Sequence, residues 1–159
     1  MWRVGRRPAA RAPTRRPPRH PGLRSTMALR WYTIVVDCRD VAAQAQWWAD
    51  VLGWKKIYEA EDEAVIVPKW VTMESAKETP WERQAQGIVF GHVPEPKTGK
   101  NRIHIDLAAH TSDDRDAEIA RLLAMGATRA DVGQTGEESW DVFADPEGNE
   151  FCVLTSRER

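Results

Sequence analysis

The chain has 159 residues, of which 42% are hydrophobic and 30% charged, with a formal net charge of -1. This composition fits one ordinary globular domain or two small modules, and it excludes a membrane protein, a collagen-like chain or a fully disordered one. The charge is unevenly divided, because residues 1–26 hold eight arginines and no acid, which leaves 15 basic and 24 acidic residues from Met27 onward. A body with a net charge of -9 binds polyanions poorly, so we expect no nucleic-acid partner.

Residues 1–26 also contain five prolines and few apolar residues. Such a segment buries too little apolar surface to offset the entropy of ordering, so we expect a disordered Arg/Pro-rich tail. It lacks the apolar run of a secretory signal. Two alternatives stay open: a translated upstream stretch, with Met27 rather than Met1 as the true start, or a flexible basic arm.

The body has two cysteines, Cys38 and Cys152, and is long enough to build its own core. A disulfide scaffold is therefore not required. We expect a cytoplasmic protein with no membrane partner.

The first predicted elements of the body are a strand at 31–36 and a helix that begins after Asp40. The strand is rich in β-branched and aromatic residues, and Asp40 is a good N-cap. Gly53 suits the position just after the helix. The apolar stripe of this helix consists of Val41, Ala45, Trp48 and Leu52, which recur at helical spacing.

The same pattern returns later in the chain. A strand is predicted at 103–107, Asp113 is a second N-cap, and Gly126 ends the second helix. Its apolar stripe consists of Ile119, Leu122 and Leu123. Cap and glycine are thirteen positions apart in both units, and the units lie about 71–73 positions apart, which indicates an internal duplication.

Each helix is followed by three further strand candidates, whereas residues 69–86 are predicted to be a long loop or arm. The strand candidates are 56–60, 64–67 and 87–93 in the first half and 128–132, 139–144 and 150–155 in the second. The predicted fold class is therefore α+β. Two βαβββ modules, at about 29–93 and 101–155 of a domain spanning 27–159, would form an incomplete barrel around a cleft, with the helices outside.

Strand alternation predicts which side chains face that cleft. Ile103, Ile105 and Leu107 form an apolar face that belongs under a helix, and Ile34, Val36, Phe151 and Val153 are assigned to the helix layer in the same way. The predicted cleft residues are Trp31, Thr33, Arg102, His104, Asp106, Glu150 and Cys152.

Several of these residues allow two interpretations. His104 is either an acid or base oriented by Asp106, or a histidine satisfied by hydrogen bonds to Asp106 or to a strand neighbour. Arg102 pairs either with a substrate carboxylate or with an acid of the body. Cys152 is either a small buried apolar residue or a nucleophile. Trp31 is a candidate platform for a planar ligand, whereas Trp48 belongs to the core.

The body resembles the vicinal oxygen chelate superfamily, in particular its glyoxalase-like and bleomycin-resistance-like domains, over about residues 29–155. The motifs that carry this resemblance lie at 36–40, 47–48, 52–54, 93–107 and 145–152. The resemblance implies the two-module fold, a small-molecule ligand and a homodimer.

Active members of that superfamily hold a divalent metal through two histidines and a last-strand glutamate. The resemblance maps these positions onto Thr33, His104 and Cys152, so only His104 has the residue type of the superfamily's metal ligand. A further position falls on strand 88–93, which offers no carboxylate. Glu150 lies on the same predicted face as Cys152 and could reach inward.

The sequence thus leaves three functional hypotheses, and it does not decide whether the protein is an enzyme. The first is a glyoxalase-like protein that binds a small organic molecule in a cleft without the usual metal centre. The alternative is a metal-dependent lyase, isomerase or dioxygenase with an altered ligand set of His104, Cys152 and Glu150. The third is a partner-binding module whose cleft is filled by its own tryptophans.

Overall fold

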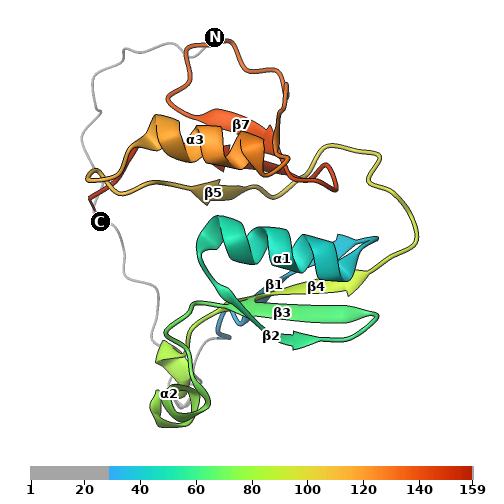
Figure 1. Cartoon of the computed structure of the whole chain (residues 1–159), viewed down its shortest axis with the longest axis vertical. Coiled ribbons are helices and arrows are strands. Elements are labelled where there is room, and N and C mark those ends of the chain that lie inside the picture. The colour runs from blue at the N-terminus through green and yellow to red at the C-terminus, as the bar shows by residue number, and fades with distance from the viewer. Residues whose placement is uncertain (1–28, 159) are drawn as a thin grey trace, which may run out of the picture. The chain divides into compact units, whose positions relative to one another are not determined.

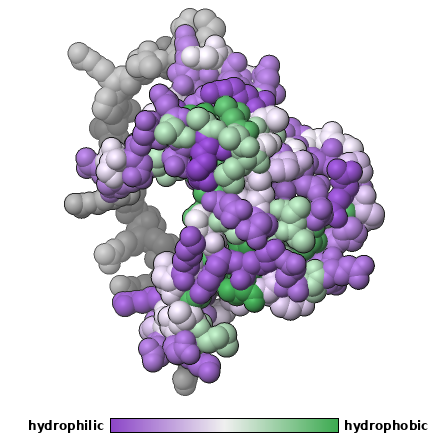
Figure 2. Space-filling view, viewed as in Figure 1, coloured by the Kyte–Doolittle hydropathy of each residue, from purple (hydrophilic) through white to green (hydrophobic). Residues whose placement is uncertain are grey.

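The computed structural model describes residues 29–158, and Trp31–Arg159 make up one compact unit (Figure 1). The tail predicted at 1–26 lies outside the described residues. Within the described part, no helix combines the length and apolarity needed to cross a membrane. Figure 2 shows hydrophilic side chains spread over the visible face of this unit, with smaller hydrophobic areas between them.

The structure has two four-stranded mixed sheets with identical topology, which agrees with the repeated pattern of the sequence. The first sheet has the order β1-β4-β3-β2 and the second has β5-β8-β7-β6. In each sheet the first and last strands along the chain pair in parallel, and the other pairs are antiparallel. The first sheet consists of β1 (Thr33–Cys38), β2 (Lys55–Glu59), β3 (Glu63–Val67) and β4 (Gly87–His92), and the second of β5 (Ile105–Leu107), β6 (Thr128–Arg129), β7 (Asp141–Ala144) and β8 (Glu150–Val153). The α+β fold of two modules is thus confirmed, and the sheets do not close into a barrel.

Helix α1 (Val41–Leu52) has the predicted ends. The Asp40 side chain accepts a hydrogen bond from the N–H of Ala43 at 3.0 Å, and Gly53 adopts a left-handed conformation with φ 62°. Glycine reaches this conformation at no steric cost, which explains the helix end. The buried side of the helix includes Val41, Ala45 and Trp48.

Helix α3 (Arg115–Ala124) begins one residue later than predicted. Its N-cap is Asp114, whose carboxylate accepts from two backbone N–H groups of the first turn. The prediction of Asp113 was wrong because this residue closes the preceding turn, where its N–H donates to the carbonyl of His110.

The predicted stripe of α3 is correct at two of its three positions. Ile119 and Leu122 are buried, whereas Leu123 is 41% exposed. At about 100° per residue, Leu123 lies about 40° to one side of Ile119 and Leu122 about 60° to the other, so Leu123 stands at the solvent edge of the apolar stripe.

Strand β5 is shorter than predicted. It begins at Ile105, and the residues at 102–103 form a bend that leaves Ile103 73% exposed. The bend follows Asn101, whose backbone N–H is held by the Glu150 carboxylate at 3.0 Å. Assigning Ile103 to the helix layer was therefore wrong, because strand alternation starts only at Ile105.

The segment predicted as a long arm contains the short helix α2 (Met73–Glu78) and the 3₁₀ turn η1 (Trp81–Arg83). Thr72 and Ser75 form a reciprocal capping box at the start of α2. Neither short helix buries a residue, and Trp81 stacks on the ring of Tyr32 at 5.6 Å between centroids.

Helix α1 joins the two modules in one core. Trp47 and Trp48 meet Phe151 of β8 edge to face, with ring centroids 5.9 and 5.3 Å apart. Beside them lies the buried carboxylate of Asp145, which accepts hydrogen bonds from the Gln44 amide and from the Trp48 indole N–H. A module taken alone would leave this face of α1 without its partners.

We predict that Asp145→Ala lowers the free energy of unfolding by about 3 kcal/mol, because it leaves buried donors of Gln44 and Trp48 unsatisfied. Chemical denaturation followed by tryptophan fluorescence measures this loss. Asp50→Ala is the control, because among the described residues its exposed carboxylate accepts only from Gln46 on the same helix, so the expected change is below about 0.5 kcal/mol. Equal effects of the two substitutions would contradict the role assigned to Asp145.

A second prediction concerns two glycines of β4. A Cβ atom at Gly87 would lie 2.8 Å from the carbonyl oxygen of Ile66, whereas a Cβ at Gly91 meets nothing closer than 3.7 Å. We expect Gly87→Ala to destabilise the protein by about 1–3 kcal/mol through overpacking, and Gly91→Ala to leave stability nearly unchanged. Thermal unfolding of the two variants tests this difference.

Candidate functional site

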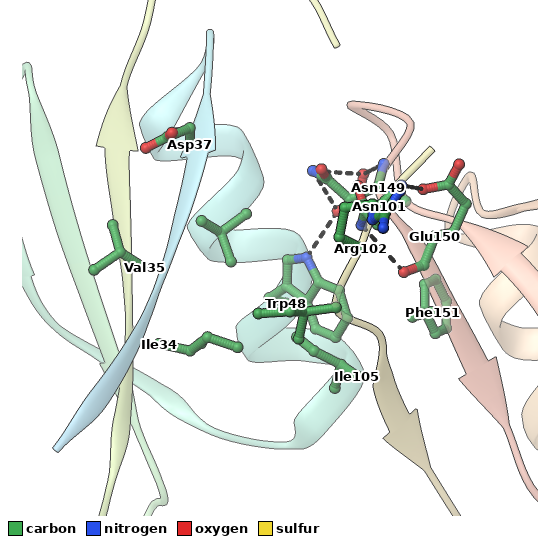
Figure 3. A pocket seen from close by; sticks show the side chains of 13 residues that line it. Ile34, Val35, Asp37, Trp48, Asn101, Arg102, Ile105, Asn149, Glu150 and Phe151 are labelled. Atoms are coloured by element: carbon green, nitrogen blue, oxygen red, sulfur yellow. Dashed lines mark hydrogen bonds between the residues drawn. The ribbon is translucent and has the colours of Figure 1, made fainter. Parts of the chain in front are cut away.

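A cavity of about 360 Å³ lies between β1 and the start of the β5–β8 pair, and we refer to it as the β1–β5 cavity (Figure 3). The residues that line its apolar part are Ile34, Val35, Val36, Trp48, Ile103, Ile105 and Phe151, and we refer to Ile34, Val36, Trp48, Ile105 and Phe151 as its apolar wall. Alternation along β1 explains this wall, because Ile34 points toward Trp48 and Ile105 while Val35 points to the other side of the strand. The cavity therefore lies on the helix side of the first sheet.

Polar residues line the opposite part of the β1–β5 cavity. They are Asp37, Asn101, Arg102, Asp145, Asn149 and Glu150. Two of the sequence-predicted site residues, Arg102 and Glu150, thus line this cavity, and the other five do not.

The Asp145 carboxylate is saturated by donors. Besides Gln44 and Trp48, the backbone N–H groups of Glu147 and Asn149 donate to it at 3.0 and 2.9 Å, and the Asn149 amide donates as well. This side chain is structural and has little capacity left for a ligand.

The Glu150 carboxylate is also engaged. It forms an ion pair with Lys97 at 2.9 Å and accepts from the backbone N–H of Asn101 at 3.0 Å. Burial acts to raise the pKa of Glu150, but the hydrogen bonds from Lys97 and Asn101 outweigh it and lower the pKa overall. Glu150 therefore fixes the loop that leads to β5.

Arg102 differs from these carboxylates. Its side chain is exposed at the edge of the cavity, and it forms no hydrogen bond or ion pair with any of residues 29–158. Of the two interpretations of Arg102, pairing with an acid of the body does not occur within the described part of the chain.

Thr33 and Trp31 belong to the other face of the first sheet. The Thr33 hydroxyl donates to the carbonyl of Gly87 on β4 at 2.9 Å, and Trp31 is 65% exposed. The Trp31 indole N–H donates to the backbone carbonyl of Thr33 at 3.1 Å. This face, opposite to α1, is called the open face below.

His104 and Asp106 do not form the pair that the sequence suggested. His104 precedes β5, is exposed, and has its Nε2 atom 3.3 Å from the ammonium of Lys100. Asp106 lies instead opposite Cys152 in the parallel β5–β8 register. The bend at 102–103 leaves His104 outside the strand, which begins at Ile105.

Cys152 is a buried thiol. Its pKa is raised by burial and then by the negative charge of Asp106, with a smaller opposing effect of Lys100. Both main effects disfavour the thiolate, which is the form that attacks electrophiles and binds metals.

The side chains at the family's metal positions do not fit a metal site within one chain. Thr33 lies on the first sheet, whereas His104 and Cys152 belong to the second, and each already has a protein partner. Among the described residues, no three His, Cys, Asp or Glu side chains are arranged to hold a metal ion.

Sequence reasoning missed the apolar wall of the β1–β5 cavity. Alternation correctly assigned Ile34, Val36 and Phe151 to the helix layer, but it gave no sign that this layer is incompletely filled. Only the volumes and positions of side chains from β1, α1, β5 and β8 reveal the space between them.

The sequence model of the Glyoxalase-like domain family matches residues 33–154. A search of curated protein sequences finds no match.

Three solved structures illustrate the structural similarity. A glyoxalase/bleomycin resistance protein/dioxygenase family enzyme from Burkholderia phytofirmans PsJN is 17% identical, with a TM-score of 0.57, and the match covers 81% of this chain and 100% of the other. A mutant of the genomically encoded fosfomycin resistance protein FosX from Listeria monocytogenes is 13% identical, with a TM-score of 0.58. The match covers 82% of this chain and 93% of the other. A member of the glyoxalase/bleomycin resistance protein/dioxygenase superfamily from Sphaerobacter thermophilus DSM 20745 is 15% identical, with a TM-score of 0.54. The match covers 82% of this chain and 99% of the other.

At these identities the solved structures establish the fold alone, and they agree with the two-module topology described above. The family match covers most of the chain and includes both modules. On these grounds the chain belongs to the Glyoxalase-like domain family.

Proposed function

We propose that this protein binds a small organic molecule in the β1–β5 cavity and does so without the metal centre usual in its superfamily. The observation that carries the proposal is the cavity itself, about 360 Å³ with an apolar wall and a polar rim. Small-molecule sites commonly have volumes of about 300–1,000 Å³ and combine apolar walls with a few fixed polar groups.

The rim of the cavity is organised before any ligand arrives. Hydrogen bonds fix the carboxylates of Asp145 and Glu150, and Asn101 and Asn149 are held by them in turn. A fixed rim lowers the entropy cost of binding, which supports a binding site rather than a packing defect.

The chemistry of the family's metal positions supports a metal-independent site. A threonine hydroxyl is a weak ligand, and burial keeps the Cys152 thiol protonated. The FosX structure is described as a complex with Mn(II) and 1S,2S-dihydroxypropylphosphonic acid, so the structural relatives include a protein that holds both a metal and a small molecule. In our proposal this chain binds its small molecule in the β1–β5 cavity, on the helix side of the first sheet, and does so without a metal.

The alternative function, a metal-dependent enzyme using His104, Cys152 and Glu150, has less support. Glu150 is committed to Lys97 and Asn101, and His104 contacts Lys100. Metal analysis in the experiment below separates the two functions.

We also propose that the protein acts as a homodimer through the open face of the first sheet. An apolar row crosses this face, because Val35 lies opposite Val89, Val89 opposite Val65, and Val65 opposite Tyr58. Val35 and Tyr58 are 59% and 51% exposed. A second copy covering this row would remove apolar surface from water.

A reducing compartment such as the cytoplasm fits the cysteine chemistry. Cys38 and Cys152 are both free and buried. Burial, followed by the charges of nearby carboxylates, raises the pKa of Cys38 to about 11, so this thiol stays protonated and unreactive.

The function is tested with 1-naphthylacetate and its neutral amide as probes, measured by calorimetry and by tryptophan fluorescence. We expect one site per chain, unaffected by EDTA, and weakened about tenfold or more by Val36→Phe, which fills the cavity. Leu123→Phe is the control, since Leu123 is an exposed residue of α3 that does not line the cavity.

Two results would contradict this proposal. One is that neither probe binds at a site sensitive to Val36→Phe. The other is that elemental analysis finds about one metal per chain that resists dialysis and disappears in His104→Ala, which would favour the metal-dependent enzyme.

The dimer is tested by sedimentation velocity over a range of concentrations. We expect Val35→Glu to shift the protein toward monomer, because it places a charge in the middle of the apolar row. Leu123→Glu, an equally drastic change at an exposed position of α3, should leave the dimer intact. A monomeric wild type, or dissociation by both variants alike, would refute the proposed interface.

A further inference from the structure

We infer that the ligand of the β1–β5 cavity is an apolar organic acid with one carboxylate, which pairs with Arg102 while an aromatic or branched tail lies against Trp48. This inference rests on the proposed binding function and specifies the ligand class. It is carried by the charges around the cavity and by the chemistry of its wall.

Arg102 supplies a cation that has no partner within residues 29–158. Its guanidinium group is exposed at the cavity edge and has no hydrogen bond or ion pair within residues 29–158. A guanidinium offers a planar fork of N–H donors that matches the two oxygens of a carboxylate.

The three acidic residues among those that line the cavity do not cancel this charge. Asp145 is saturated by five donor groups, and Glu150 is neutralised by Lys97. The Asp37 side chain extends toward the open face, where its Oδ1 atom is 3.7 Å from the Cβ position of Gly91 on β4 (Figure 3). The unpaired charge on the cavity side is therefore positive.

The number of available cations favours a single negative charge on the ligand. Lys97 is held by Glu150, and the ammonium of Lys100 contacts His104. Arg102 is left as the one cation lining the cavity among the described residues. A carboxylate matches this arrangement better than a doubly charged phosphate does.

The wall of the cavity favours an apolar tail. The only polar atom of the Trp48 side chain, its indole N–H, already donates to Asp145 at 3.1 Å. Trp48 thus presents apolar ring surface to the cavity, next to Ile34 and the ring of Phe151. Aromatic and branched groups bury the most surface against such a wall.

The test compares 1-naphthylacetate with 1-naphthylacetamide, which has nearly the same shape and no charge, by calorimetry on the full chain. We expect the acid to bind at least about tenfold more tightly than the amide, and its affinity to fall as salt rises. Arg102→Gln should weaken the acid about 10- to 100-fold and change the amide by less than about twofold.

Two further variants complete the design. Arg83→Gln removes an exposed arginine of η1 that does not line the cavity, so both affinities should stay unchanged. Arg102→Lys keeps the charge without the planar fork and should restore part of the preference for the acid.

The outcomes separate this inference from the function on which it rests. If acid and amide bind equally, both weakened by Val36→Phe, the cavity is a binding site and the inference is overturned. If Arg102→Gln weakens acid and amide alike, Arg102 is structural and the inference fails in the same way. If neither probe binds, the proposed function and the inference both fall.

Discussion

One buried carboxylate holds the two modules in their arrangement. Asp145 opens the turn between β7 and β8, accepts two backbone N–H groups of that turn, and reaches Gln44 and Trp48 on α1. A carboxylate in an apolar core is stable only where donors surround it, so this geometry tolerates little displacement. The second module is thereby fixed against the helix of the first, and the ring contacts of Trp47 and Trp48 with Phe151 follow.

The same constraint creates the β1–β5 cavity. Trp48 is held by Asp145 on one side, and Glu150 fixes the loop before β5 on the other, so neither element can collapse onto β1. The space left between Ile34, Trp48 and Ile105 is therefore a product of two polar networks that serve the fold. A ligand would enter a site whose rim is already rigid, which lowers the cost of binding.

Because side chains alternate along β1, the proposed dimer interface and the proposed ligand cavity lie on opposite sides of this strand. Thr33 and Val35 belong to the open face. Ile34 and Val36 face the helix side and the cavity. Our proposals follow this division: the open face joins two copies of the chain, and the helix side holds the ligand.

The sequence by itself determined the elements and their repetition. Local signals such as Asp40, Gly53 and the apolar alternation of β1 act over a few residues, and the two-module topology they predict is the one observed. Short-range ambiguity explains the misplaced N-cap at Asp113, since its neighbour Asp114 is an equally good cap.

Only the tertiary structure decided how the candidate site residues combine. His104 was expected beside Asp106, but a contact between Glu150 and Asn101, which are far apart in sequence, bends the chain and leaves His104 with Lys100. Only the structure shows that Arg102 has no ion-pair partner within residues 29–158, because this depends on all the groups that surround its side chain in space. Such properties depend on contacts between distant segments, and no local pattern of residues encodes them.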